Sequence, residues 1–392
     1  MKRIALVNQR YGAEVNGGSE QYTRLIAERL AAFYEVDVIT TTALDYTTWE
    51  NYYPPGESRL DGVRVLRFPV EHPRAKDFDQ YNGDYLARMG AGERDLSREA
   101  VWFEKQGPYA PGAIDYLRTH KDDYEAILFV TYLYYLTVAG LPEVADKAIL
   151  IPTAHEEPFI HFATYERLFQ LPRAFVFLTD EERMLVQKLF HNEQIPYDVM
   201  GTGVDIPGEP NAWHLYNEYG VTDPYLVYVG RIDEGKDCPR MFQYFLEYKK
   251  RRPDTKLKLV LMGKAVCDIP QHPDIMPLGF VSDEEKFHVM CGAKALVLPS
   301  RFESLSMAVL ESMALSVPVI VNGRCDVLRG HCTKSDAGLY YYNYFEFEGI
   351  VDYLFSHQKV YEQMQKNARR YIDEHYRWDV IIDRFRKVIE TL

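Results

Sequence analysis

The sequence lacks several features that would each indicate a class of protein. Its five cysteines form no CxxC pair, which argues against a disulfide scaffold and against a structural zinc site. No run approaches the roughly 18 apolar residues of a membrane-spanning helix. Positive charge is scarce, with 45 lysines and arginines against 58 aspartates and glutamates, a net charge of −13. We therefore expect no nucleic-acid partner and, at most, peripheral contact with a membrane.

Two small groups of potential metal ligands are present, and neither is expected to hold an ion. Cys325, His331 and Cys332 lie close in sequence but lack the spacing of a zinc site. Asp77 and Asp79 form an Asp-x-Asp pair that follows no apolar strand directly, so we expect a solvated surface pair. The sequence therefore predicts no metal and no other cofactor.

The 392 residues, 47% of them hydrophobic, can form two or three domains with large cores. The apolar run in MKRIALVNQRYG is too short for a signal peptide and is soon followed by glutamates. We expect a cytoplasmic protein, with any membrane association confined to the inner face. The sequence does not indicate an oligomeric state.

The most informative stretch is PSRFESLSMAVLESMALSVPVIV, residues 299–321. It reads as the end of a strand, a loop, a helix, a small turn and a new strand. Ser304 and Ser306 are candidate N-caps of the helix. Glu303 lies in the loop, and Glu311 is expected about two turns into the helix.

This arrangement suits a nucleoside diphosphate sugar. A helix N-terminus offers free N–H groups and the positive end of the helix dipole, so the amides of Ser304, Leu305 and Ser306 could hold phosphate. A carboxylate accepts hydrogen bonds from vicinal hydroxyls. Glu303 could therefore take sugar hydroxyls and Glu311 ribose hydroxyls, although Glu311 could also lie on a solvated helix face.

The same stretch closely resembles the glutamate–seven–glutamate signature of retaining family-4 glycosyltransferases of the GT-B fold. Ser304, Ser306 and Ser316 stand where the family usually has glycines. The resemblance covers nearly the whole chain, most strongly residues 1–30 and 225–345. It implies an α/β protein with two facing Rossmann-like domains and an active site in the interdomain cleft.

A glycine-rich loop, residues 12–18, separates a predicted strand at Ile4–Asn8 from a helix predicted from about Ser19 to Phe33. This is the opening of a doubly wound sheet. The loop lacks GxGxxG, which weakens a nicotinamide interpretation. Gly17 and Gly18 permit close approach of backbone to phosphate, or form a simple turn. The resemblance places them beside the donor diphosphate.

A polar cluster, TAHEEP at residues 153–158, follows the predicted strand Ala148–Pro152. Open α/β sheets bind ligands at the carboxyl ends of their strands. His155 resembles the family histidine that faces the donor sugar, which implies that it orients or polarises groups there. A purely structural histidine is the alternative.

Two further segments resemble the family's donor site. GRIDEGK, residues 230–236, is similar to its glycine–arginine–lysine phosphate loop, in which Arg231 would supply a planar fork and Lys236 a point charge. On spacing alone both could be surface charges. MPLGFVS, residues 276–282, resembles the turn against the nucleotide base, where Phe280 and Val281 would line the site and Phe280 would supply an apolar wall.

We divide the chain into an N-terminal domain at 1–200 on the acceptor side, a linker at 201–223, a donor domain at 224–368, and a C-terminal helix at 369–392 that returns toward the first domain. Residues 72–112 are predicted to be irregular. By resemblance they help to form the acceptor side.

The implied function is transfer, with retention, of a hexose-type sugar from a UDP- or GDP-linked donor to a carbohydrate or lipid-linked acceptor in surface-polysaccharide assembly. Metal is unnecessary if cationic side chains and the helix dipole neutralise the leaving diphosphate. The predicted catalytic residues are His155, Glu303, Arg231 and Lys236.

Two other classes remain open. A sugar-nucleotide epimerase of GT-B fold would need acid/base carboxylates, for which Glu156 and Glu157 are candidates. A non-catalytic sugar-binding or scaffolding relative would keep the fold and lose catalytic groups, and the five residues that the resemblance assigns disfavour it. They are His155, Arg231, Lys236, Glu303 and Glu311.

Overall fold

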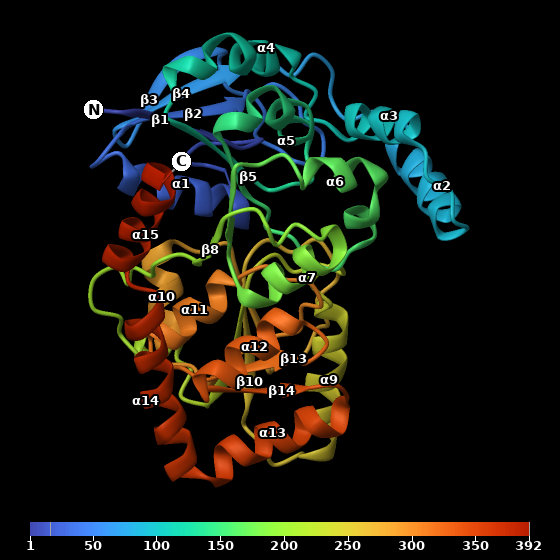
Figure 1. The fold of residues 1–392 in the computed structure, drawn as a ribbon. Helices are drawn as coiled ribbons and strands as arrows, with labels where there is room; N and C mark the ends of the chain where they lie inside the picture. The colour runs from blue at the N-terminus through green and yellow to red at the C-terminus, as the bar shows by residue number, and fades with distance from the viewer. Residues whose placement is uncertain (16, 392) are drawn as a thin grey trace. The chain divides into compact units, whose positions relative to one another are not determined.

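The computed structural model describes residues 1–15 and 17–391 and divides into two α/β units. The first unit comprises Met1–Thr202 and the residues from Asp379 onward, and the second comprises Gly203–Trp378. Figure 1 traces the first from blue to green with the final red helix, and the second from yellow-green to orange-red. Each unit is built on a mostly parallel sheet, which confirms the predicted fold of two Rossmann-like domains.

The first unit has an eight-stranded sheet of order β3-β4-β2-β1-β5-β6-β7-β8. Only β3 pairs antiparallel among the described strands. The strand order reverses between β1 and β5, the place where doubly wound sheets bind ligands. The strands are β1 (Arg3–Val7), β2 (Glu35–Thr41), β3 (Gly56–Leu60), β4 (Val63–Phe68), β5 (Ala126–Val130), β6 (Ala148–Ile151), β7 (Ala174–Phe177) and β8 (Tyr197–Val199).

Helices cover this sheet, and the α1 helix ends at Leu30 rather than at the predicted Phe33. Residues 72–112 are not irregular as predicted, because they contain α2, α3 and the start of α4. Trp102 of α3 is fully buried and packs edge-on against Phe78 and Phe162. The helices are α1 (Gly18–Leu30), α2 (Phe78–Gly90), α3 (Leu96–Gln106), α4 (Pro111–His120), α5 (Tyr135–Gly140), α6 (Ala163–Leu168), α7 (Asp180–Phe190) and α15 (Trp378–Thr391).

The second unit has a six-stranded parallel sheet of order β11-β10-β9-β12-β13-β14. Its order reverses between β9 and β12, so the loops after these two neighbouring strands emerge at the same edge. The strands are β9 (Tyr225–Val229), β10 (Lys258–Met262), β11 (Ile275–Gly279), β12 (Ala295–Leu298), β13 (Val319–Asn322) and β14 (Gly338–Tyr341).

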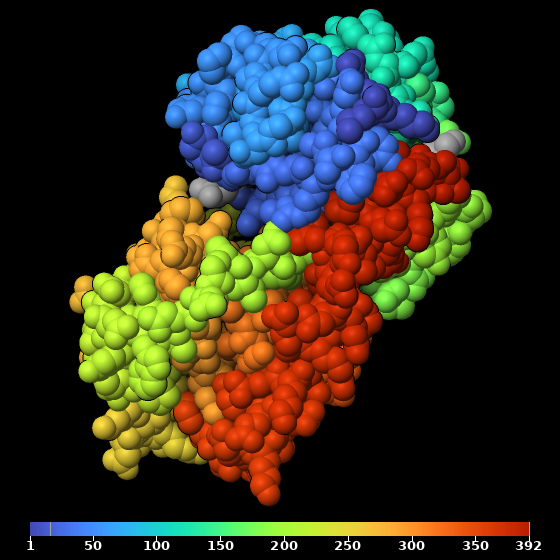
Figure 2. Space-filling view, turned by 90° about the vertical axis from the view of Figure 1, so that its left-hand side faces the viewer, coloured from blue at the N-terminus to red at the C-terminus, as the bar shows by residue number. Residues whose placement is uncertain are grey.

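One helix of the second unit, α9, buries a single apolar stripe. On α9 the stripe is Met241, Phe242, Phe245 and Tyr248, at the three- and four-residue spacing of a helix that packs on a core. The segment before β9 lies at the surface in Figure 2. Two aromatic side chains of this segment, Trp213 and Tyr216, are exposed. The helices are α8 (His214–Tyr219), α9 (Cys238–Arg251), α10 (Asp283–Cys291), α11 (Met307–Ala314), α12 (Asp326–Ser335), α13 (Tyr344–Ser356) and α14 (Gln358–His375).

The chain passes between the units twice, after Thr202 and after Trp378. The first and last residues of the second unit contact each other, because a Cβ on Gly203 would lie 2.3 Å from Cδ2 of Trp378. Val204 N donates to Tyr376 O at 3.3 Å. The two passages therefore run side by side. No helix among the described residues is both long and apolar enough to span a bilayer.

We predict that Gly203→Ala destabilises the protein by roughly 1–3 kcal/mol, the usual range for overpacking, because the indole of Trp378 must move. Urea unfolding followed by fluorescence would measure this. Gly349→Ala is the control: its Cβ would meet nothing within 4 Å inside α13, so we expect a gain of about 0.5–1 kcal/mol. Wild-type stability of Gly203→Ala would contradict the close contact.

Candidate functional site

The loop after β9 carries Arg231 and Lys236 and is organised by Asp233. One carboxylate oxygen of Asp233 accepts from Lys236 N at 2.8 Å, and the other pairs with Nε of Arg231. The hydroxyl of Tyr228 donates to Arg231 O at 2.6 Å. The guanidinium of Arg231 is 42% exposed, so it can reach a ligand while its backbone is fixed.

Backbone contact holds this loop against the loop after β10. A Cβ on Gly263 would lie only 1.9 Å from Gly230 O, and Gly263 has a φ of 138° that other residues rarely adopt. Gly263 N also donates at 2.7 Å to the carbonyl of Gly279, the last residue of β11, which pairs with β10 on its other side. Position 263 therefore requires glycine for both space and conformation.

The structure brings Lys236 and Glu303 together, although they lie 67 residues apart in the chain. Lys236 Nζ donates to Glu303 Oε1 at 2.7 Å, and the two side chains are 31% and 13% exposed. The contact follows from the sheet, since the loops after β9 and β12 leave the same edge. The lysine and the carboxylate form a half-buried ion pair, and the charge-assisted hydrogen bond between them is strong.

The helix that follows begins directly after Ser306, the second of the two expected N-cap positions. The α11 helix starts at Met307, with Ser306 in the N-cap position but in the left-handed region, φ 69°, and without a side-chain cap hydrogen bond. The prediction that the Ser306 hydroxyl caps the helix is therefore wrong, and Ser304 lies too early to be the N-cap. Ser316 is also left-handed, with φ 60°. Glycine adopts this conformation without strain, which explains why serine is unusual at these two positions.

Glu311 is the fifth residue of α11, little more than one turn in rather than two. It is 8% exposed, so the alternative of a solvated helix face is wrong. Lys286 Nζ, from α10, donates to Glu311 Oε1 at 2.9 Å. Burial raises the pKa of Glu311 above its usual range, and the nearby charge of Lys286 opposes that rise.

The loop before α11 is held in place by side chains of α12 and α14. Leu305 is buried, and its carbonyl contacts His331 Nε2 at 2.7 Å, while His331 Nδ1 contacts the Tyr371 hydroxyl at 3.1 Å. His331 thus supports the loop with both ring nitrogens.

No cluster of three or more His, Cys, Asp or Glu residues suited to a metal occurs in the described part of the chain. Asp77 is exposed and pairs with Lys105 at 2.7 Å.

The segment expected to form a turn against the base is partly a strand. Residues 276–279 belong to β11, and only Phe280 and its successors form a connection to α10, whose N-cap Ser282 accepts from Glu285 N at 3.2 Å. Phe280 is 73% exposed, and Val281 is partly buried. Phe280 would therefore form an apolar wall of the site only by packing its side chain against a bound ligand.

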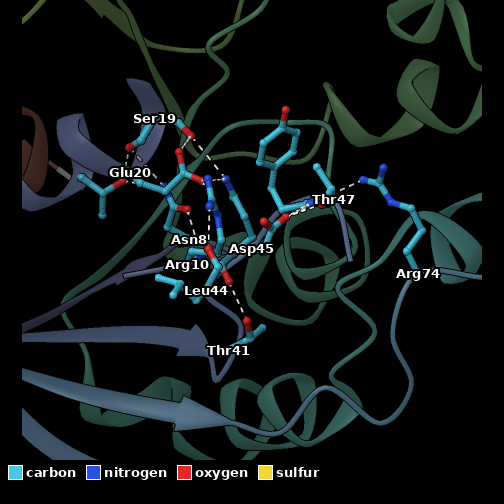
Figure 3. Close-up of polar contacts among 12 residues, drawn as sticks. Asn8, Arg10, Ser19, Glu20, Thr41, Leu44, Asp45, Thr47 and Arg74 are labelled. Carbon is cyan, nitrogen blue, oxygen red and sulfur yellow. Dashed lines mark hydrogen bonds and ion pairs between the residues drawn. The ribbon is translucent and has the colours of Figure 1, made fainter. Parts of the chain in front are cut away.

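In the first unit, the glycine loop packs on a buried ion pair that the sequence analysis missed (Figure 3). Arg10 Nη2 donates to Glu20 Oε1 at 2.6 Å, and both side chains are 6% exposed. A Cβ on Gly17 would lie 2.2 Å from Glu20 Oε2. The absence of a side chain at Gly17 therefore makes room for the Glu20 carboxylate. Around Gly18 a Cβ would meet nothing within 4 Å. Of the two predicted donor glycines, only Gly18 therefore borders open space.

His155 lies in the first unit, four residues after β6. Its Nε2 is 3.5 Å from Glu157 Oε2, and the Tyr132 hydroxyl donates to the other oxygen of Glu157 at 2.6 Å. Burial would raise the pKa of Glu157, but the contacts with His155 and Tyr132 outweigh it and the pKa lies below its usual range. Glu156 turns away to His161, at 2.6 Å.

A buried glutamate fixes the loop that carries His155. Glu182, in the first turn of α7, accepts from Ala154 N and from Leu178 N, each at 2.6 Å, and so ties together the ends of β6 and β7. Burial raises the pKa of Glu182 to about 8, although the backbone N–H groups favour its ionised form. The sequence signal was only an acidic first turn, which is typical of many exposed helices.

The second unit is similar in sequence to a known protein family. Residues 217–371 match the family model described as "Glycosyl transferases group 1". This part of the chain is therefore similar to the group 1 glycosyltransferases. It contains Arg231, Lys236, Lys286, Glu303 and Glu311.

Several individual proteins are also similar to this chain, in sequence or in fold. An uncharacterized glycosyltransferase, MJ1607 of Methanocaldococcus jannaschii, is 22% identical over 97% of the chain and 95% of its own length. The alpha-D-kanosaminyltransferase of Streptomyces kanamyceticus is 30% identical over 30% of the chain and 34% of its own length. Anabaena Alr3699/HepE, solved in complex with UDP-glucose, has a TM-score of 0.71 at 13% identity, with both chains fully covered. Together these findings support a glycosyltransferase of the GT-B fold.

We predict that Glu182→Gln flattens the dependence of stability on pH. The folded-state pKa of Glu182 is raised from an ordinary 4.5 to about 8, so its proton stabilises the native state at low pH. That stabilisation is complete below the unfolded pKa and is lost as pH rises through the folded pKa. Its slope is at most about 1.4 kcal/mol per pH unit.

Urea unfolding at several pH values between the two pKa values would measure the slope. Glu166→Gln is the control, because Glu166 is an exposed glutamate on α6. We expect Glu166→Gln to keep the wild-type slope. An unchanged slope in Glu182→Gln would show that this carboxyl does not titrate as its burial requires.

Proposed function

We propose that the chain is a retaining glycosyltransferase of the family-4 type, moving a hexose-type sugar from a UDP- or GDP-linked donor to a carbohydrate or lipid-linked acceptor. The observation that carries the proposal is the Lys236–Glu303 ion pair, 2.7 Å long, within the segment that matches the group 1 family. A uridine donor is supported by the UDP-glucose complex of the similar Anabaena protein. In this proposal the second unit binds the donor and the first unit contributes acceptor groups.

The ion pair suggests how the donor enters. An incoming diphosphate competes with Glu303 for Lys236, and Arg231 on the same loop supplies a second cation. Glu303, released from Lys236, then accepts hydrogen bonds from the sugar hydroxyls. Amides at Ser304, Leu305 and Ser306 would add to the phosphate contacts and Glu311 would bind the ribose, while Gly18 leaves room for the donor.

The chemical step breaks the bond between the anomeric carbon and the diphosphate oxygen, and forms a bond from that carbon to an acceptor hydroxyl on the same face. The acceptor proton passes to the departing phosphate oxygen. Negative charge grows on the diphosphate, so Lys236 and Arg231 interact more strongly in the transition state than before it. His155 would orient the sugar. These cations make a metal ion unnecessary in the proposed scheme.

A donor screen followed by product analysis tests the function. A nucleotide sugar at 100 times its dissociation constant should stabilise the protein by about 2.7 kcal/mol, visible as a thermal shift with UDP- or GDP-sugars. Transfer assays with the stabilising donor should give a product of retained anomeric configuration by NMR, at equal rates with and without EDTA. Release of an epimer of the donor sugar would instead identify an epimerase, and binding without turnover a sugar-binding relative.

Replacing the lysine of the ion pair separates binding from chemistry. We predict that Lys236→Ala lowers kcat by roughly ten- to a hundredfold, the effect of losing a hydrogen bond to a charged group, because the lost contact strengthens as the glycosidic bond breaks. Lys256→Ala, at an exposed lysine in the same unit, should leave kcat and KM unchanged. Wild-type kcat in Lys236→Ala would place the diphosphate elsewhere.

A further inference from the structure

We infer that Lys286 is a positioning residue for the nucleoside half of the donor, holding Glu311 ionised and leaving one of its oxygens for the ribose. The inference rests on the proposed function and deepens it by naming a residue that sequence reasoning did not single out. It stands on the contacts between α10 and α11, both within the second unit.

Lys286 and Glu311 form a nearly enclosed ion pair. Lys286 Nζ lies 2.9 Å from Glu311 Oε1, and the side chains are 13% and 11% exposed. Glu311 Oε2 has no hydrogen-bond partner among the described residues, so one lone-pair-bearing oxygen remains available. The side chain therefore presents a single fixed acceptor, which suits one or two vicinal hydroxyls.

The lysine matters because the carboxylate is buried. A buried carboxylate without a nearby cation takes up a proton, and a protonated carboxyl donates where the ribose needs an acceptor. The charged groups that face Glu311 are Lys286 and Asp283, of which Asp283 raises the pKa and Lys286 lowers it. Among these described groups, Lys286 therefore supplies the positive charge that keeps Glu311 an acceptor.

Lys286 also has a second partner, which provides a control. Its Nζ lies 3.1 Å from Asp283 Oδ1, whose side chain is 76% exposed. An ion pair with one partner this exposed contributes little energy because water screens that partner. If the lysine acts through Glu311, removing Asp283 should leave nucleotide binding nearly intact.

The experiment compares binding of UDP with that of 2′,3′-dideoxyuridine diphosphate, which lacks both ribose hydroxyls, by calorimetry; GDP and its dideoxy analogue replace them if GDP is the preferred nucleotide. We expect the wild type to prefer the ribose form about ten- to a hundredfold, as for a hydrogen bond to a charged group. Lys286→Met should bind the two forms within about threefold of each other by weakening the ribose form, with a smaller change in kcat than in KM. Asp283→Asn should keep the wild-type ratio.

A purely structural lysine would lower stability without changing this ratio, so a wild-type ratio in folded Lys286→Met overturns the inference. If Lys286→Met does not fold, Lys286→Gln replaces it with the same expected loss of discrimination. In either variant, affinity for the ribose form should rise with pH as Glu311 ionises. Wild-type protein that binds neither UDP nor GDP contradicts the proposed function itself, and tight UDP binding without a dideoxy penalty contradicts only the assignment of Glu311 and Lys286.

Discussion

The ion pair between Lys236 and Glu303 depends on one constraint: neighbouring parallel strands end at the same edge of a sheet. The loops after β9 and β12 meet there because these strands pair directly at the reversal of strand order. Two residues far apart in the chain thus become a cation and an anion in contact. The groups proposed to neutralise the phosphate, Lys236 and Arg231, and the Glu303 carboxylate proposed to bind the sugar all lie in loops at this edge.

Burial of charge shapes both units in a similar way. Arg10 and Glu20 form an enclosed pair beneath the glycine loop of the first unit, and Lys286 and Glu311 form another in the second. A buried charge without a partner costs several kcal/mol, so each pair requires both members. Glu182 is the exception. Among the described residues its carboxylate accepts from the backbone N–H groups of Ala154 and Leu178, and burial raises its pKa to about 8.

The sequence predicted the two-domain fold and the strands around the site because these strands are short apolar runs bounded by clear breaks. The sequence-based predictions failed where the structure depends on an unusual backbone conformation or on contacts between residues far apart in the chain. Ser306 is the N-cap of α11 but makes no side-chain cap hydrogen bond, and nothing in the sequence indicates its left-handed φ. Residues 72–112 were predicted to be irregular, since their apolar stripes are interrupted by charges and only packing around Trp102 makes α2 and α3 stable. Arg10 and Lys286 were missed because their partners lie 10 and 25 residues away, and Glu182 because one of its partners, Ala154, lies 28 residues away.

The two passages of the chain after Thr202 and Trp378 make the second unit an insertion within the first. The second unit is one continuous segment, whereas the first is completed only by α15, where Arg384 pairs with Asp198 of β8 and Glu390 accepts from the Tyr34 hydroxyl. During synthesis on the ribosome, the inserted unit therefore leaves the exit tunnel before the first unit has all of its residues. The unit made first is the last to be finished, and a truncation of the final helix would damage the end of the molecule that was synthesised at the start.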